Sequence, residues 1–130
     1  MRTVSNVVDS SAWLEYLADG PNAGEFAAAI ETVRTLVVPT IVISEVVRRL
    51  DAQGRRAIIP DVLAQMRQAT IVPLDDQLAI DAATLGRRQG LALADSIVYA
   101  TTQAVGGTLW TQDEDFKALP KVEFRAHKRR

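Results

Sequence analysis

The stretch VSNVVDSSAWLEYL, residues 4–17, changes at Asp9 from a β-branched run into an apolar helical segment. The run Val4 to Val8 favours a short buried strand, and Asp9 with the two serines after it offers helix caps before residues 12–17. A Gly-Pro pair then ends the helix. The stretch therefore predicts a strand followed by a helix, with a carboxylate at the junction.

The same alternation continues to the end of the chain. Further strands are expected at residues 35–38, 69–72, 108–110 and 122–124, and further helices at 22–33, 41–52, 57–68, 76–88, 93–105 and 113–119. Short strands separated by helices need crossover connections and bury both faces, as in a parallel sheet. We therefore expect an α/β fold, a three-layer α/β/α sandwich with a five-stranded, mainly parallel sheet. No linker or repeat interrupts it, so residues 1–130 are expected to form a single domain.

Composition narrows the chemistry. The chain of 130 residues has no cysteine and one histidine, which excludes a disulfide framework and a Cys/His zinc site. Its formal net charge is −1, so overall positive charge does not attract nucleic acid to it. Arginine pairs and the basic segment 127–130 are expected to be solvated. With no signal-peptide pattern after Met1 and no apolar run near the roughly 20 residues of a membrane span, we expect a cytoplasmic protein.

Four acidic residues share one kind of position. Asp9, Glu45, Asp95 and Asp113 each lie where an apolar segment meets the start or first turns of an expected helix. Because the carboxyl ends of parallel strands meet at one edge of the sheet, these side chains are expected to gather there. Carboxylates so gathered repel one another unless a hard cation such as Mg²⁺ joins them. This pattern favours a metal-dependent enzyme, in which one or two Mg²⁺ or Mn²⁺ ions would promote phosphodiester cleavage by activated water.

Each acid also has a local explanation. Asp9 suits the N-cap of the first helix, and Asp95 lies where a helix dipole favours negative charge. Glu45 and Arg49 have the spacing of a surface ion pair. These local explanations do not account for four separate segments that each place a carboxylate where a strand gives way to a helix or within an apolar helix.

The fourth acid has a neighbouring alternative. Asp115 follows Asp113 by two residues, and either could face a metal ion. Thr111 and Glu114 also have the spacing of a capping box, which would make this segment a simple helix start. We prefer Asp113 as the site residue, and Asp115 as a first-turn acid of the helix that follows.

These segments together resemble the PIN-domain family, in particular the ribonuclease toxins of the VapC type from prokaryotic toxin–antitoxin modules. The resemblance spans nearly the whole chain and rests on residues 8–11 (VDSS), 44–46 (SEV), 93–100 (LADSIVYA) and 109–116 (LWTQDEDF). It implies a Mg²⁺- or Mn²⁺-dependent endoribonuclease whose catalytic and metal-binding residues are Asp9, Glu45, Asp95 and Asp113. Ser10 and Thr111 match small hydroxyl positions that support the acids.

The resemblance also implies partners. It implies an RNA substrate and a homodimer whose activity is blocked by a cognate antitoxin that lies across the helices near the site. An antitoxin arginine that reached the acidic cluster would inhibit by displacing the metal or by pairing with its ligands. Trp13 and Trp110 are expected to pack in the core, although the first helix contributes to partner contact in this family. Which RNA is cut, whether one or two ions bind, and which surface forms the dimer are left open by the sequence.

Three other interpretations compete with this one. A phosphorylation receiver is also a small parallel α/β domain, but neither Asp51 nor Asp61 follows a convincing strand. A PIN-like module that only binds would not need the full acidic set. A PIN-like nuclease acting on DNA or structured nucleic acid would need an additional clamp that this short chain does not obviously contain.

Overall fold

A parallel sheet forms the centre of the molecule. The structure is a computed structural model that describes residues 4–129, so Met1–Thr3 and Arg130, which belong to the expected N-terminal lead-in and basic end, lie outside the described residues. In chain order the elements are β1 (Asn6–Val8), α1 (Ser10–Leu17), α2 (Ala23–Glu31), β2 (Leu36–Pro39), α3 (Thr40–Ala52), η1 (Arg56–Ile58), α4 (Ile59–Arg67), β3 (Thr70–Val72), α5 (Asp76–Gln89), α6 (Leu93–Ala104), β4 (Thr108–Thr111), η2 (Glu114–Phe116) and β5 (Val122–Phe124).

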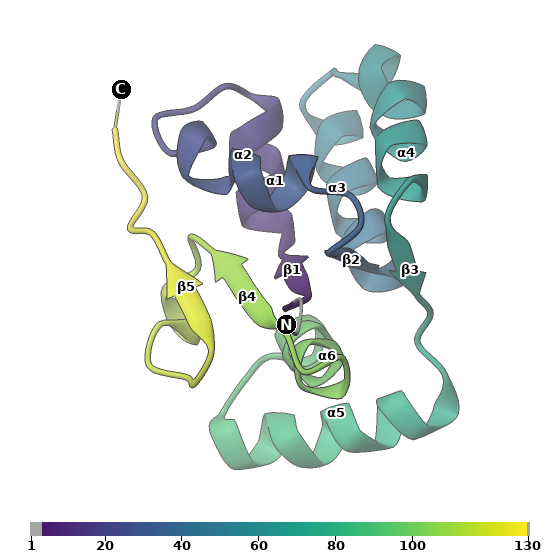
Figure 1. Ribbon diagram of the computed structural model, residues 1–130, viewed down its shortest axis with the longest axis vertical. Coiled ribbons are helices and arrows are strands. Elements are labelled where there is room, and N and C mark those ends of the chain that lie inside the picture. The colour runs from purple at the N-terminus through teal and green to yellow at the C-terminus, as the bar shows by residue number, and fades with distance from the viewer. Residues whose placement is uncertain (1–3, 130) are drawn as a thin grey trace.

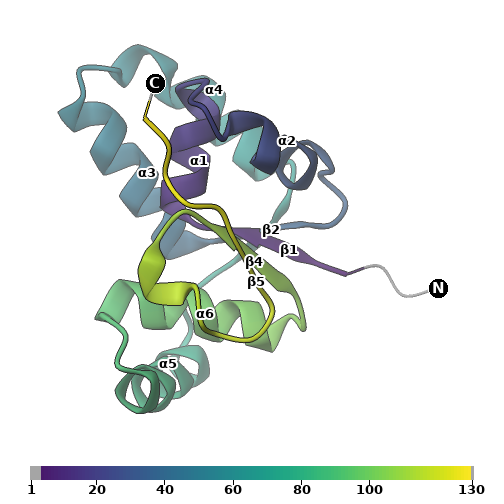
Figure 2. The same cartoon turned by 90° about the vertical axis from the view of Figure 1, so that its left-hand side faces the viewer.

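The strands lie in the order β3-β2-β1-β4-β5, and every pairing is parallel (Figure 1). Helices α1 to α4 lie on one side of the sheet and α5 with α6 on the other (Figure 2). This arrangement confirms the expected α/β/α sandwich, and the sheet is parallel throughout rather than mainly so. Because the strands are parallel, their carboxyl ends share one edge, where the connections to α1, α3 and η2 begin.

The core is built from the β-branched strand residues and a few large side chains. Val7 and Val8 of β1 are fully buried, as expected for a central strand covered on both faces. Trp13 on α1 and Phe116 on η2 are also fully buried, which confirms the packing role expected of Trp13. Trp110 is partly buried, packs against this core and donates its indole N–H to Asn6 Oδ1 at 2.9 Å.

Two expectations about the last connection are wrong. Only residues 114–116 are helical, as the short 3₁₀ turn η2, and the expected helix from Asp113 to Leu119 does not form. The N-cap of this turn is Asp113, whose side chain accepts from the Asp115 N–H, so no capping box starts at Thr111. The Thr111 hydroxyl instead donates to Asp9, in a different segment of the chain. Within residues 4–129, no helix has the length and apolar character needed to cross a membrane.

Candidate metal centre

Asp9 is the most buried acid of the site. It directly follows β1, and only 5% of its surface is exposed. Its Oδ1 accepts from the Ala12 N–H at 3.0 Å and from the Ser11 hydroxyl at 2.7 Å, while Oδ2 accepts from the Thr111 hydroxyl at 2.6 Å. Burial raises the pKa of Asp9 from 3.8 to about 6, although these three hydrogen bonds act in the opposite direction. Asp9 is therefore both the helix cap that the sequence suggested and a carboxylate held at the carboxyl edge of the sheet.

Thr111 links Asp9 to the fourth acid. Besides donating to Asp9, its buried hydroxyl accepts from the Asp113 N–H at 2.8 Å. The Asp113 carboxylate in turn accepts from the Asp115 N–H at 2.9 Å and caps η2. This chain of hydrogen bonds fixes the acid after β1 relative to the acid after β4, two strands that are neighbours in the sheet.

Glu45 reaches the same place from α3. Its carboxyl is half-buried, and burial raises its pKa, as does the charge of Asp113, while a hydrogen bond from Ser10 lowers it. Ser10 therefore supports an acid of the site, as expected for this position. Among the ion pairs of the described residues, none joins Glu45 to Arg49, so the proposed surface pair is not formed.

Asp95 occupies the third position of α6. Burial raises the pKa of its carboxyl from 3.8 to about 6, and the charges of Asp113, Glu45, Asp9 and Asp115 all act in the same direction. Asp113 is also tied to Asp9 through the Thr111 hydroxyl, and Glu45 feels the charge of Asp113. The segments that the sequence marked are therefore brought together at one edge of the sheet.

The structure also brings in Asp115, which the sequence predicts to be a first-turn acid of the following helix. Oxygens of Asp95, Asp113 and Asp115 all lie within 4.8 Å of one another. Asp113 and Asp115, which the sequence presented as alternatives, therefore both face the cluster. The donors are carboxylate oxygens, which suit a hard cation such as Mg²⁺, and a bound cation would relieve the repulsion seen in the raised pKa of Asp95.

A groove lies beside this cluster on the α1 and α3 side. It has a volume of about 400 Å³ and is lined by Ser10, Ser11, Leu14, Glu45, Arg48, Arg49 and Ala52. The two arginines are exposed and lie on the helix that carries Glu45. The groove therefore combines site residues with cations that can contact phosphate groups.

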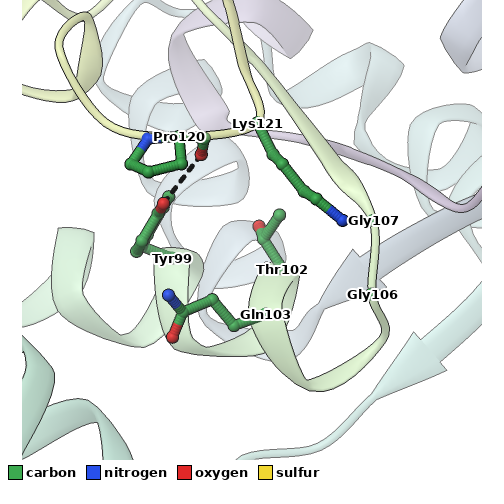
Figure 3. A pocket seen from close by; sticks show the side chains of 7 residues that line it. All are labelled: Tyr99, Thr102, Gln103, Gly106, Gly107, Pro120 and Lys121. Carbon is green, nitrogen blue, oxygen red and sulfur yellow. Dashed lines mark hydrogen bonds between the residues drawn. The ribbon is translucent and has the colours of Figure 1, made fainter.

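A second pocket lies at the other end of α6 (Figure 3). It has a volume of about 320 Å³, and one of its walls is fixed by the Tyr99 hydroxyl, which donates to the Pro120 carbonyl at 2.7 Å. Lys121 is the charged residue in its lining, and no acid lines it. This pocket is therefore separate from the acidic cluster and has no oxygen ligands of the kind found there.

The sequence did not identify every residue that holds the site. The sequence predicts a helix cap at Ser11 and includes it in the motif of residues 8–11, but does not show that its hydroxyl donates to Asp9 and accepts from the Gln112 N–H at 3.1 Å. Asn22 binds Gln112 from the start of α2. The pair Ser10-Ser11 was a sequence signal for the role of Ser11, because adjacent residues at a helix start face different neighbours. The contact between Asn22 and Gln112 had no sequence signal.

Comparison with known proteins gives one family match. The PIN domain family profile matches residues 7–122 of the chain. No curated protein matches the sequence.

Several solved structures share the fold at low sequence identity. A toxin–antitoxin complex from Klebsiella pneumoniae aligns with a TM-score of 0.75 at 20% identity, covering 92% of this chain and 96% of that one. VapC20 from Mycobacterium tuberculosis, described as a sarcin–ricin loop cleaving toxin, has a TM-score of 0.74 at 20% identity and covers 93% and 99%. FitAcB from Neisseria gonorrhoeae has a TM-score of 0.69 at 20% identity and covers 92% and 96%. Identities this low establish a common fold.

Proposed function

This chain belongs to the PIN-domain family, and from that membership and its acidic site we propose that it is a Mg²⁺- or Mn²⁺-dependent endoribonuclease acting as the toxin of a toxin–antitoxin module. One observation supports the proposal above the others. The acids that follow β1 and β4 and Glu45 of α3 all raise the pKa of Asp95 at the start of α6, and oxygens of Asp95, Asp113 and Asp115 lie within 4.8 Å of one another. Apolar residues at these positions would stabilise the fold at least as well as a cluster of carboxylates, so the cluster points to a function.

We assign the catalytic and metal-binding roles to Asp9, Glu45, Asp95 and Asp113, with Asp115 as an additional ligand. The residues fit a hard divalent cation in ligand type and, for the three aspartates that approach within 4.8 Å, in spacing. When bound, the ion supplies an activated water and positive charge beside the scissile phosphate.

The chain itself contributes positioning. The hydrogen bonds of Thr111 and Ser11 to Asp9 favour its ionised form, which is the form that binds a cation. Ser10 does the same for Glu45. Arg48 and Arg49 line the adjoining groove and would contact phosphates that flank the cleaved bond.

The partners follow from the relatives. Proteins of the same fold occur in toxin–antitoxin complexes, and we propose that a cognate antitoxin binds the groove between α1 and α3 and reaches the acids with an arginine. We further propose a homodimer, a cytoplasmic location and a single domain over residues 1–130. A solution mass near twice the 14.2 kDa of one chain would support the dimer, and purification from the native host without a bound antitoxin would contradict the inhibitory partner.

Cleavage of labelled total RNA tests the central proposal. The purified protein is incubated with Mg²⁺ or Mn²⁺, and EDTA and the variant Asp95→Asn serve as controls. Asp61→Asn is the matched variant, because Asp61 is also the third residue of its helix but is exposed and lies outside the cluster. We expect metal-dependent cutting that Asp95→Asn loses and Asp61→Asn keeps.

The outcomes separate the alternatives. Cutting of DNA but not RNA would assign the protein to the other class of PIN-like nuclease. A folded protein that binds Mg²⁺ and RNA but cuts neither RNA nor DNA would be a module that only binds. Equal loss of cutting in both variants would remove Asp95 from the site.

A further inference from the structure

The segment that follows β5 leaves the sheet at the edge that carries the acidic cluster. Phe124 at the end of β5 pairs with Thr111 at the end of β4, and the Arg125 N–H donates to the Thr111 carbonyl at 2.9 Å. The chain then turns away from the sheet toward the start of α2 (Figures 1 and 2). Residues 126–129 therefore begin close to the loop that contains Asp113.

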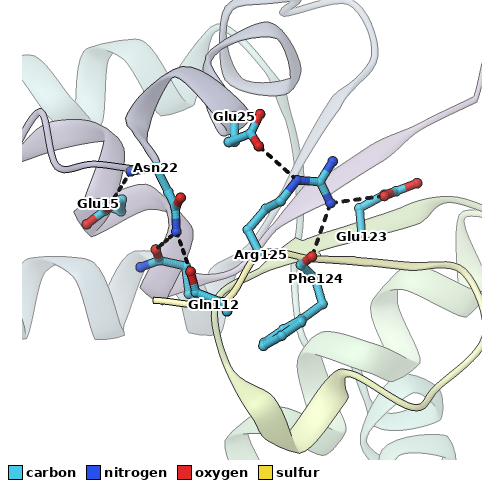
Figure 4. A network of polar contacts seen from close by, with 8 residues as sticks. Glu15, Asn22, Glu25, Gln112, Glu123, Phe124 and Arg125 are labelled. Carbon is cyan, nitrogen blue, oxygen red and sulfur yellow. Dashed lines mark hydrogen bonds and ion pairs between the residues drawn. The ribbon is translucent and has the colours of Figure 1, made fainter. Parts of the chain in front are cut away.

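The buried amide of Asn22 holds the start of this segment. The side chain of Asn22, which is fully buried, donates from Nδ2 to Gln112 Oε1 at 2.7 Å and to the Ala126 carbonyl at 2.8 Å (Figure 4). Gln112 directly precedes Asp113, and its own N–H donates to Ser11. One amide group thus ties the start of the basic segment to the loop of the catalytic acids.

Arg125 anchors the segment from the other side. Its guanidinium lies 5.5 Å from the centre of the Trp110 ring and is 3.4 Å from Glu25 and 3.2 Å from Glu123 (Figure 4). These contacts use the positive charge of Arg125 within the protein. They also pair the carboxylates of Glu25 and Glu123, which would otherwise repel an anion passing along this edge.

The next three side chains form no such ion pairs among the described residues. His127, Lys128 and Arg129 are exposed, and they form no ion pair with the part of the chain that the structure describes. From the fixed carbonyl of Ala126, three residues extend roughly 10 Å. That reach keeps Lys128 and Arg129 within roughly 10 Å of the Ala126 carbonyl, which Asn22 joins to Gln112, the residue before Asp113.

We propose that residues 127–129 bind phosphate groups of the RNA strand that enters the acidic site, an inference that rests on the proposed function. A polyanion approaching clustered carboxylates needs local positive charge, and Lys and Arg contacts to phosphate supply it without reading sequence. A protein partner is a poorer fit, because residues 127–129 offer none of the apolar or aromatic anchors typical of a protein interface core.

A pair of double variants tests this role. Lys128→Gln with Arg129→Gln removes two positive charges from the segment. Arg34→Gln with Arg67→Gln removes two exposed charges that precede β2 and β3, at the opposite edge of the sheet. Binding of a labelled single-stranded RNA is measured with Mg²⁺ over a range of salt concentrations, with Asp95→Asn present in every protein, including the parent, to stop cleavage.

We expect the segment variant alone to bind more weakly. Two lost phosphate contacts would reduce the slope of log affinity against log salt by about 1.4, since each contact to a single strand contributes about 0.7. If the two proteins bind equally at 1 M salt, this change in slope lowers the affinity at 0.1 M salt about 25-fold. Without the Asp95 substitution, the same variant should raise KM for RNA cleavage and leave kcat unchanged.

Each other outcome overturns the inference. Unchanged binding by the segment variant would do so while leaving the proposed function intact, because the parent still binds and the unaltered protein still cuts. Equal weakening by both double variants would show a general charge effect. Loss of a co-purifying antitoxin with RNA binding unchanged would assign the segment to a protein partner. A parent protein that binds no RNA would count against both the inference and the proposed function.

Discussion

Replacing Asp95 by asparagine should make the metal-free protein more stable at pH 7.5. A carboxyl whose pKa is raised from 3.8 to about 6 destabilises the folded state at neutral pH by about 3 kcal/mol, at about 1.4 kcal/mol for each pH unit. Asp95 is only half-buried, so solvent screening reduces this to about 1–2 kcal/mol. Asparagine also loses the favourable interaction with the α6 dipole, which costs about 0.3–1 kcal/mol. Removing the charge, which relieves first the cost of its burial and then the repulsion from the neighbouring acids, is the larger effect, and the net gain is about 1 kcal/mol.

The destabilisation of the folded state by Asp95 depends on pH. Because the pKa of Asp95 is higher in the folded protein, the folded state binds the proton more tightly than the unfolded chain. The destabilisation is complete above about pH 6 and disappears as the pH falls below 3.8. The advantage of the variant over the unaltered protein should therefore shrink between pH 7.5 and pH 4.

Thermal melts followed by circular dichroism measure both quantities. In EDTA at pH 7.5 we expect Asp95→Asn to raise Tm by about 3–5 °C for a chain of this size, and Asp61→Asn to lower it slightly through the lost dipole interaction alone. Magnesium at ten times its Kd should stabilise the unaltered protein by about 1.4 kcal/mol and the Asp95 variant much less. Two results would refute the reasoning: a variant that melts below the Asp61 control in EDTA, or one that magnesium stabilises as much as the unaltered protein.

Three further changes test the supporting structure. Thr111→Val should lower the free energy of unfolding by about 2–4 kcal/mol and raise the pKa of Asp9, since a buried carboxylate oxygen and the partly buried Asp113 N–H lose their partner. Unchanged denaturant melts and an unchanged NMR titration of Asp9 would contradict this. Gly86→Ala should lower the free energy of unfolding by about 1–3 kcal/mol, because its methyl group would overlap the Ser96 side chain of α6. Gly24→Ala, a helical glycine with open space around it, should raise the free energy of unfolding by about 0.5–1 kcal/mol. Thermal melts that rank the two variants the other way would disprove the packing of α5 on α6. Asp115→Asn should weaken magnesium binding several-fold in calorimetry without loss of fold, and unchanged affinity would restrict this acid to η2.

Much of the fold follows from local chemistry. The β-branched run before Asp9 could be assigned to a strand because a buried parallel strand needs apolar side chains on both faces, and Asp9 itself marked the helix start as an N-cap. The connection after β4 could not be predicted in the same way. Its capping signal at Thr111 was locally valid, but the hydroxyl binds Asp9 at the end of the neighbouring strand, and a 3₁₀ turn forms further along.

The acidic site was also predictable only in part. The segments of Asp9, Glu45, Asp95 and Asp113 could be predicted to meet because parallel strands place their carboxyl ends at one edge. That Asp115 also turns its carboxylate toward Asp95 depends on the path of the chain around η2, which is set by the burial of Phe116 and the return to β5.

The sequence by itself determined the order of the elements, the parallel sheet and the acids that lie at its carboxyl edge, because periodicity, caps and strand direction are properties of consecutive residues. Only the tertiary structure decided which hydroxyls hold Asp9, that Asp115 joins the cluster, and that Asn22 fixes the basic segment beside Gln112. Those contacts join elements far apart in the chain. Their geometry is set by how helices pack on the sheet, and local sequence does not encode it.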